Sequence, residues 1–326
     1  FIAPSKLEDL AEIMYVLMCG AGVGFSVESQ TAQSFSQIKM QTGQKLKTHL
    51  VADSKSGWCD ALTLGLKTWF AGKDIDFDFR ELRPAGARLK TMGGRSSGPA
   101  PLIDLLSFAR RKILARQGRR LSNIDLHDIV CKIGEIVVAG GVRRSALISL
   151  SDLDDAEMRD AKKGQFFLKE PQRSLANNSV AYNKKPTCAE FLSEWLALIE
   201  SGSGERGIFN RGDLERQMPA RRWKVFKKGF QTSGMNPCGE IILRSKQFCN
   251  LSDVVARKDD TEKSLLKKIR IAAILGTYQS MLTHFPYLSK EWKKNCEEER
   301  LLGVSITGQW DSPAARDIKT LQKMKE

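Results

Sequence analysis

The chain has 326 residues, of which 41% are hydrophobic and 28% charged, a composition of folded proteins rather than of disordered or membrane-embedded ones. No apolar run approaches the roughly 20 residues that a membrane-crossing helix needs, and no signal peptide opens the chain, so we expect a cytoplasmic protein. The net charge of +14 favours polyanionic partners, from nucleic acid to nucleoside triphosphates, without choosing between them.

Cysteines and chain ends give two further expectations. The chain starts at Phe1 rather than Met and stops in RDIKTLQKMKE without a helix stop signal, which predicts a piece of a longer protein. Seven cysteines are too few and too scattered for a disulfide framework, so any redox chemistry should be local and reversible. They are Cys19, Cys59, Cys131, Cys188, Cys238, Cys249 and Cys296.

The first elements alternate helix with glycine-rich turns. Apolar spacing predicts a helix over 7–19. GAGVGFSVE (20–28) then predicts a turn and a short strand that another backbone or a ligand approaches closely. These glycines do not complete a dinucleotide-binding fingerprint, because the third glycine of that pattern is missing and a helix precedes them. Asp53 or Ser54 should cap an amphipathic helix that ends at Gly72.

Basic and glycine-rich stretches follow. RPAGARLKTMGGRSSGP (83–99) predicts a loop that either wraps an anion or lies flexibly on the surface. The runs at 109–120 and 221–230 are either a nucleic-acid surface or the solvated face of a helix. We favour the solvated face, because no helix-turn-helix, zinc or RNP-like signature accompanies them.

The rest of the chain alternates helices with short strands. A helix over 122–138 leads through GGVRRSA into the strand SALISL, and the arginine pair before it could read a phosphate or base or simply lie on the surface. No internal repeat is visible, although two rounds of strands with helices are compatible with a two-part barrel. The later predictions are a strand in 175–183, helices over 188–201 and 261–282, and a helix end followed by a strand in 297–313.

The segment NPCGE concentrates chemical groups in five residues. The residue before a proline avoids helical geometry, so we expect the segment to be extended. In an extended chain Asn236, Cys238 and Glu240 share one face, which brings an amide, a thiol and a carboxylate to one small ligand. Gly239 removes side-chain bulk and lets a substrate approach the backbone.

A carboxylate beside a thiol disfavours a thiolate nucleophile, and the three histidines are all distant in sequence. The spacing of Cys238 and Cys249 matches no usual zinc pair. A neutral thiol beside a base fits hydrogen-atom chemistry, in which the thiol supplies a radical and the carboxylate takes a proton. The alternative is that both cysteines are buried packing residues.

Eight motifs, in chain order over nearly the whole sequence, resemble those of the adenosylcobalamin-dependent (class II) ribonucleotide reductases, and most closely the monomeric ribonucleoside-triphosphate reductases. They are GAGVGFSVE, DSKSGW, RPAGARLKTMGG, GGVRRSA, ANNSVAYN, NPCGEI, CNL and ERLLGVSITGQWDSP.

The resemblance implies an α/β fold, a ten-stranded barrel of two five-stranded halves with the radical cysteine on a central finger loop. For this chain it implies the first half-barrel, the finger loop and the start of the second half, with a helical effector-binding insertion. The expected divisions are the start of the barrel (1–39), the insertion (40–120) and the barrel core (121–326), with the finger loop near 234–251.

The resemblance also implies roles for the residues of the finger loop. Cys238 would become a thiyl radical that removes the ribose 3′ hydrogen, with Glu240 as base at the 3′ hydroxyl and Asn236 hydrogen-bonded to the substrate. Cys249 would be one of two thiols oxidised to a disulfide as the 2′ hydroxyl leaves as water. The implied cofactor is adenosylcobalamin, with no protein-held metal site.

The implied partners are a ribonucleoside triphosphate, a deoxynucleoside triphosphate effector and thioredoxin or a similar dithiol, acting on a monomer, with no membrane and no nucleic acid. Asp53, Ser54 and Arg88 match the effector-binding region. The specificity loop, which transmits effector identity to the substrate base, would contain Gly140, Gly141, Arg143 and Arg144.

Several features of the family are missing. Its other redox cysteine lies upstream of the GVGF strand, and we do not expect Cys19 to be its equivalent. The later barrel strands, their phosphate-binding loop and a C-terminal cysteine pair are also missing, so we expect the isolated 326 residues not to turn over. The alternatives from other classes are a basic nucleic-acid-binding module and a catalytically inactive nucleotide-binding fragment of a split or truncated reductase.

Overall fold

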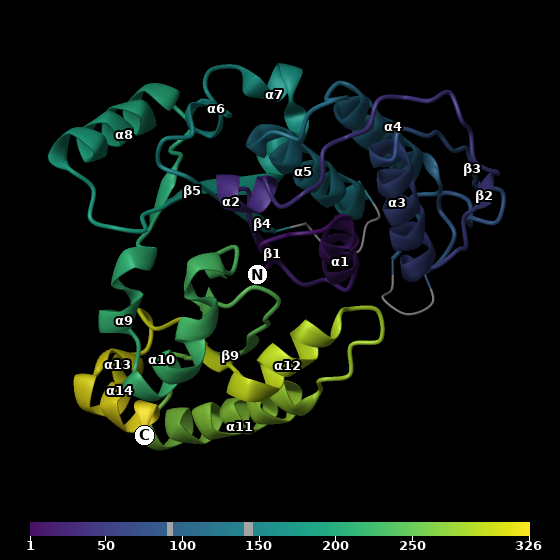
Figure 1. The fold of residues 1–326 in the computed structure, drawn as a ribbon. Helices are drawn as coiled ribbons and strands as arrows, with labels where there is room; N and C mark the ends of the chain where they lie inside the picture. Colours follow the sequence, from purple (N-terminus) through teal and green to yellow (C-terminus); the bar gives the residue numbers. More distant parts are fainter. Residues whose placement is uncertain (90–93, 140–145) are drawn as a thin grey trace. The chain divides into compact units, whose positions relative to one another are not determined.

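The computed structural model describes residues 1–89, 94–139 and 146–326 (Figure 1). These residues form two compact units, Phe1–Ser245 and Lys246–Glu326, and each is described by itself.

The first unit is built on a four-stranded sheet in which all neighbouring strands are parallel. Its order is β1 (Val23–Ser26), β4 (Leu147–Ser151), β5 (Ala176–Ala181) and β6 (Gly207–Phe209). Every residue of β1 and β4 is buried, as expected of parallel strands covered on both faces. The sheet therefore forms the centre of this unit.

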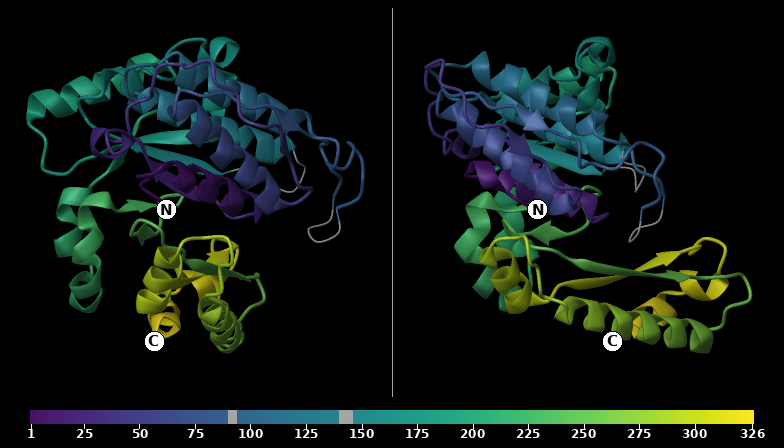
Figure 2. Two further views of the ribbon diagram at one scale, coloured as in Figure 1. Left: turned by 45° about the vertical axis from the view of Figure 1, so that its right-hand side comes forward. Right: turned by 90° about the vertical axis from the view of Figure 1, so that its right-hand side faces the viewer.

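Four long helices pack around the sheet and on each other (Figure 2). They are α1 (Leu7–Met18), α3 (Lys55–Phe70), α4 (Ala100–Leu114) and α5 (Asn123–Ala139). α1 contacts both α3 and α5, and α4 lies between α3 and α5 in the packing order. The helices predicted over 7–19, 51–72 and 122–138 are thereby confirmed.

Shorter elements complete the first unit, and the strand predicted in 175–183 and the helix predicted over 188–201 are confirmed among the elements above and below. The two-residue strands are β2 (His49–Leu50), β3 (Phe77–Asp78), β7 (Gly234–Met235) and β8 (Ile242–Leu243). The further helices are α2 (Ser29–Ala32), α6 (Ala156–Arg159), α7 (Phe166–Lys169), α8 (Cys188–Ser201), α9 (Leu214–Gln217) and α10 (Ala220–Phe226). The 3-10 turns are η1 (Pro171–Leu175), η2 (Arg211–Asp213) and η3 (Lys227–Thr232).

The second unit contains a parallel pair of strands covered by helices. β9 (Asn250–Val255) pairs with β10 (Leu302–Thr307), and α11 (Glu262–Met281) lies along both strands (Figure 2). Leu265 of α11 is fully buried in the core beside Ala315. The helix and strand predicted in 261–282 and 297–313 are confirmed. The other helices are α12 (Lys290–Glu299), α13 (Pro313–Arg316) and α14 (Ile318–Lys325).

The predicted α/β fold class is confirmed, and within the described residues the parallel sheet is open rather than closed into a barrel. The divisions at 39 and 120 stay predictions. Among the described residues, no helix has both the length and the apolar character needed to cross a membrane.

Strand β1 carries glycines where a second backbone crosses it, as the GAGVGFSVE pattern predicted. A Cβ atom placed on Gly24 would lie 1.9 Å from the carbonyl oxygen of Met235 in β7. A Cβ on Gly22 would lie 2.8 Å from the Pro237 ring. Because real Cβ atoms do not approach so closely, the path of residues 235–237 along β1 requires glycine at both positions.

We therefore expect Gly24→Ala to destabilise the first unit by about 3 kcal/mol, since the clash is with backbone and no rotamer change relieves it. For a unit of this size that corresponds to a melting temperature lower by roughly 6 to 12 °C. Thermal unfolding followed by circular dichroism measures it.

The matched control is Gly229→Ala. Gly229 has a φ of −118°, and a Cβ there would approach only the flexible Arg244 side chain, at 3.7 Å. It should stay within about 0.5 kcal/mol of the parent chain. Equal melting temperatures for the two variants would contradict the close approach at β1.

Candidate active site

The segment NPCGE forms the tip of a β-hairpin. β7 and β8 pair antiparallel, with Met235 opposite Ile242. Between them the Gly239 N–H donates to the Asn236 carbonyl over 2.9 Å, which closes a four-residue turn with Cys238 at its third position. The expectation of an extended segment with alternating side chains is wrong. Pro237 sets the second position of the turn, and Gly239 leaves it at a φ of +83°, which favours glycine.

Asn236 braces this hairpin. Its side-chain Oδ1 accepts a hydrogen bond from the Ile241 N–H over 3.0 Å, and its own N–H donates to the Ile241 carbonyl over 3.2 Å. Both sides of the loop are therefore tied across the turn through one residue. The amide that was expected to bind a substrate also has a structural role here.

The thiol and carboxylate of the motif both face outward. Cys238 and Glu240 are exposed at the tip, whereas Met235 at the base is buried. Cys249 lies in the second unit, half-buried and directly before β9. None of the cysteines forms a disulfide in the part of the chain that the structure describes.

The residues expected to bind an effector have structural partners. The Ser54 hydroxyl accepts a hydrogen bond from the Gly57 N–H over 2.9 Å and caps α3, so Ser54 rather than Asp53 is the cap. The Asp53 carboxylate instead accepts two hydrogen bonds from the Arg83 guanidinium, at 2.8 and 3.1 Å. Arg88 forms a backbone bridge in the loop of residues 83–89 and 94–99.

The four residues of the expected specificity loop are not available for comparison, because Gly140, Gly141, Arg143 and Arg144 lie outside the described residues. β4, which follows them in the chain, begins beside the Cys238 turn. Ala146 would lie 3.4 Å from a Cβ on Gly22, the same glycine that contacts Pro237.

A buried charged cluster fastens α5 to the sheet, and the sequence reasoning missed it. The fully buried Asp128 carboxylate accepts two hydrogen bonds from Arg173 and one from Lys112, all between 2.7 and 3.0 Å. Burial alone would raise the pKa of Asp128, but the hydrogen bonds from His127, Arg173 and Lys112 lower it below its usual value. The neighbouring His127 Nε2 lies 3.0 Å from the Asn178 Oδ1 of β5.

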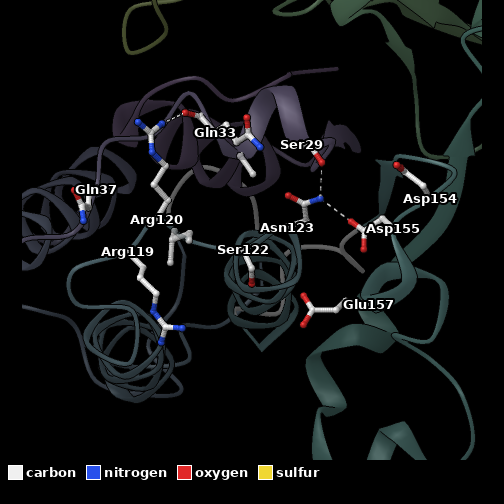
Figure 3. A pocket seen from close by; sticks show the side chains of 12 residues that line it. Ser29, Gln33, Gln37, Arg119, Arg120, Ser122, Asn123, Asp154, Asp155 and Glu157 are labelled. Carbon is white, nitrogen blue, oxygen red and sulfur yellow. Dashed lines mark hydrogen bonds between the residues drawn. The ribbon is translucent and has the colours of Figure 1, made fainter.

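A groove of about 940 Å³ opens at the other end of the strands (Figure 3). Ser29 and Asp154 line it after β1 and β4 have ended, whereas the Cys238 turn lies near the start of β1. The Asn123 amide spans the groove floor, donating to Ser29 over 3.3 Å and to Asp155 over 2.6 Å. The groove is therefore separate from the candidate active site.

Comparison with known proteins bears on both features. The family model for the insertion domain of B12-dependent ribonucleotide reductases matches residues 26–113. The adenosylcobalamin-dependent ribonucleoside-triphosphate reductase of Lactobacillus leichmannii is 30% identical over 330 residues, which cover 90% of this chain and 43% of that protein. The enzyme of the same name from Lacticaseibacillus paracasei is 32% identical, covering 83% of this chain and 36% of its own length.

The fold agrees with the sequence comparison. The crystal structure of a B12-dependent (class II) ribonucleotide reductase matches with a TM-score of 0.71 at 25% identity, covering 92% of this chain and 46% of that one. The chain thus spans about two-fifths of the length of the curated relatives that it matches.

The cap on α3 generates a prediction. Ser54→Ala removes the acceptor of the Gly57 N–H and should destabilise the first unit by about 1 kcal/mol, whereas Ser54→Asp keeps an acceptor there and should be close to neutral. Urea unfolding midpoints measure both. An unchanged midpoint in Ser54→Ala would show that the hydroxyl does not support the helix.

The exposure of the turn generates another. Iodoacetamide should modify Cys238 and Cys188 in the native chain, because both side chains are exposed, while Cys59 and Cys131 are fully buried and should be protected. Peptide mass spectrometry after a short labelling pulse reads each site separately. All four should react in guanidinium chloride, and a protected Cys238 in the native chain would contradict this placement of the turn.

Proposed function

We propose that this chain, which belongs to the adenosylcobalamin-dependent (class II) ribonucleotide reductase family, carries the radical-bearing hairpin of a ribonucleoside-triphosphate reductase. The observation that carries the proposal is the exposed Cys238 thiol at the tip of a hairpin that runs along the glycines of β1.

The proposed chemistry places each step on a named group. The Cys238 thiyl radical takes the 3′ hydrogen atom of the ribose, which re-forms the S–H bond and leaves a carbon radical on the sugar. The exposed Glu240 carboxylate, two residues away, accepts the 3′ hydroxyl proton as the 2′ hydroxyl leaves as water. Asn236 contributes its side-chain NH₂ to the substrate, since its Oδ1 is engaged with Ile241.

The exposed thiol fits the cofactor that the family uses. Cys238 lies between Pro237 and Gly239 at the apex of the turn, so a large group can reach its sulfur without displacing a neighbouring side chain. When bound, adenosylcobalamin would supply the radical that this thiol receives. The chain's own contribution is to hold the sulfur in a fixed position.

The two electrons of the reduction are proposed to come from Cys249 and a second thiol, which together form a disulfide. Thioredoxin or a similar dithiol would then restore both thiols by exchange. The effector-binding insertion, with Asp53, Ser54 and Arg88, a monomeric state and a cytoplasmic location belong to the same proposal. The match of the insertion-domain model to residues 26–113 supports the place of the insertion.

The test is Cys238→Ser in the complete gene product, assayed for reduction of ribonucleoside triphosphates with adenosylcobalamin and a dithiol. Loss of the only proposed hydrogen-abstracting group should lower kcat by at least about 10³-fold, while nucleotide binding measured by equilibrium dialysis stays unchanged.

Cys188→Ser is the matched control, because Cys188 is also exposed but lies at the start of α8. It should keep the activity of the parent protein. Reduction that survives in Cys238→Ser would exclude the radical role, and deoxynucleotide formation by the isolated 326 residues would show that the features described as missing are not needed.

A further inference from the structure

A fully buried ion pair sits where the Cys238 hairpin begins. Glu28 follows β1 by two residues, and Arg211 follows β6 by two residues. Their side chains are each 1% exposed, and the guanidinium meets the carboxylate in two parallel hydrogen bonds of 2.7 Å. Such planar, bidentate contacts are among the strongest and most directional in proteins.

The remaining donors of Arg211 reach the hairpin. Its Nη2 and Nε both donate to the Ser233 carbonyl, at 2.8 and 3.1 Å, and its Nη1 donates to the Asn183 Oδ1 at 2.9 Å. All five N–H groups of the guanidinium are therefore used. Ser233 is fully buried and immediately precedes β7.

The geometry of the sheet gives this contact its leverage. β1 and β6 are the two outer strands of the four-stranded sheet, so in a flat sheet they would lie roughly 14 Å apart. The Glu28–Arg211 pair joins the chain just beyond their ends and holds the Ser233 carbonyl in the same place. From there residues 234–237 run along β1 toward its start, where Cys238 lies.

We propose that Arg211, locked by Glu28, is a positioning residue for Cys238, because it fixes the point at which the hairpin leaves the end of the sheet. Arg211 does not touch the reacting atoms. It determines how far along β1 the hairpin reaches and so where the thiol is presented. This inference rests on the proposed function for its purpose but not for its test.

The experiment replaces the ion pair with apolar side chains of similar size, Glu28→Leu/Arg211→Met, in the 326-residue chain. Apolar replacement of a buried pair is often tolerated, whereas removing one partner leaves an unpaired buried charge. Hydrogen exchange of the hairpin amides, Asn236, Gly239 and Ile241, should become at least about tenfold faster, because the Ser233 carbonyl loses two charged donors.

A second buried pair in the same unit provides a matched control. Arg206 donates two hydrogen bonds to Glu194, at 2.7 and 2.8 Å, and others to the Asp152 and Leu153 carbonyls, but none to the hairpin. Glu194→Leu/Arg206→Met should leave exchange in residues 234–243 within about twofold of the parent chain. Equal acceleration in both double variants, or none in either, would overturn the proposal.

Conservative variants decide the case if a double variant does not fold. Arg211→Lys keeps the charge beside Glu28 but loses the planar fork, so exchange of the hairpin amides should be roughly threefold or more faster than in Arg206→Lys. Equal exchange in these two single variants would overturn the proposal.

The activity assay adds a readout that separates this inference from the reductase function. In the complete gene product, Glu28→Leu/Arg211→Met should lower kcat about tenfold or more with little change in KM, and the Glu194→Leu/Arg206→Met control should change neither. Unchanged kcat would count against the positioning role. Because amide exchange needs neither cofactor nor substrate, an inactive parent protein would refute the reductase proposal and leave the exchange result to decide on Arg211.

Discussion

The ion pair between Glu28 and Arg211 is the contact on which the arrangement of the first unit depends. Burying both charges costs several kcal/mol per ion, and this cost is offset only where every donor and acceptor is satisfied. Here the guanidinium is fully hydrogen-bonded, and Glu28 also accepts from the Ser26 hydroxyl at 2.9 Å. The satisfied pair holds together the ends of β1 and β6 and the start of the hairpin, three segments that are far apart in the chain.

The other end of the hairpin is held by shape rather than by charge. Gly22 and Gly24 leave room for Pro237 and the Met235 carbonyl, and the Phe1 ring occupies the space in which Gly234 would carry a side chain. A charged contact at the base and a close-packed track along β1 together define the hairpin's position. Hydrogen-atom transfer requires direct contact between reacting atoms, so small errors in this position would be costly.

Local features of this arrangement were predictable from the sequence, and long-range ones were not. The cap at Ser54 and the helix end at Gly72, with a φ of +73°, depend on neighbouring residues only. The close approach at β1 followed from its glycines, although not which backbone makes it. The NPCGE prediction was wrong because the turn at Gly239 overrides the extended preference of the residue before proline. The Glu28–Arg211 pair spans 183 positions, so no local pattern reveals it.

The basic run at 109–120 shows why net charge alone is a weak indication of a ligand. Several of its cations make ion pairs within the first unit, so the run is neither a nucleic-acid surface nor simply a solvated helix face. The pairs are Arg110 with Asp74, Lys112 with Asp128 and Arg116 with Asp125, at 2.5 to 2.7 Å. Hydrogen bonds from Arg110 lower the pKa of Asp74, as expected of a carboxylate that stays charged in this contact. Like Arg211, these side chains are used to join elements of the fold, so an attraction for triphosphates has to come from cations outside such pairs.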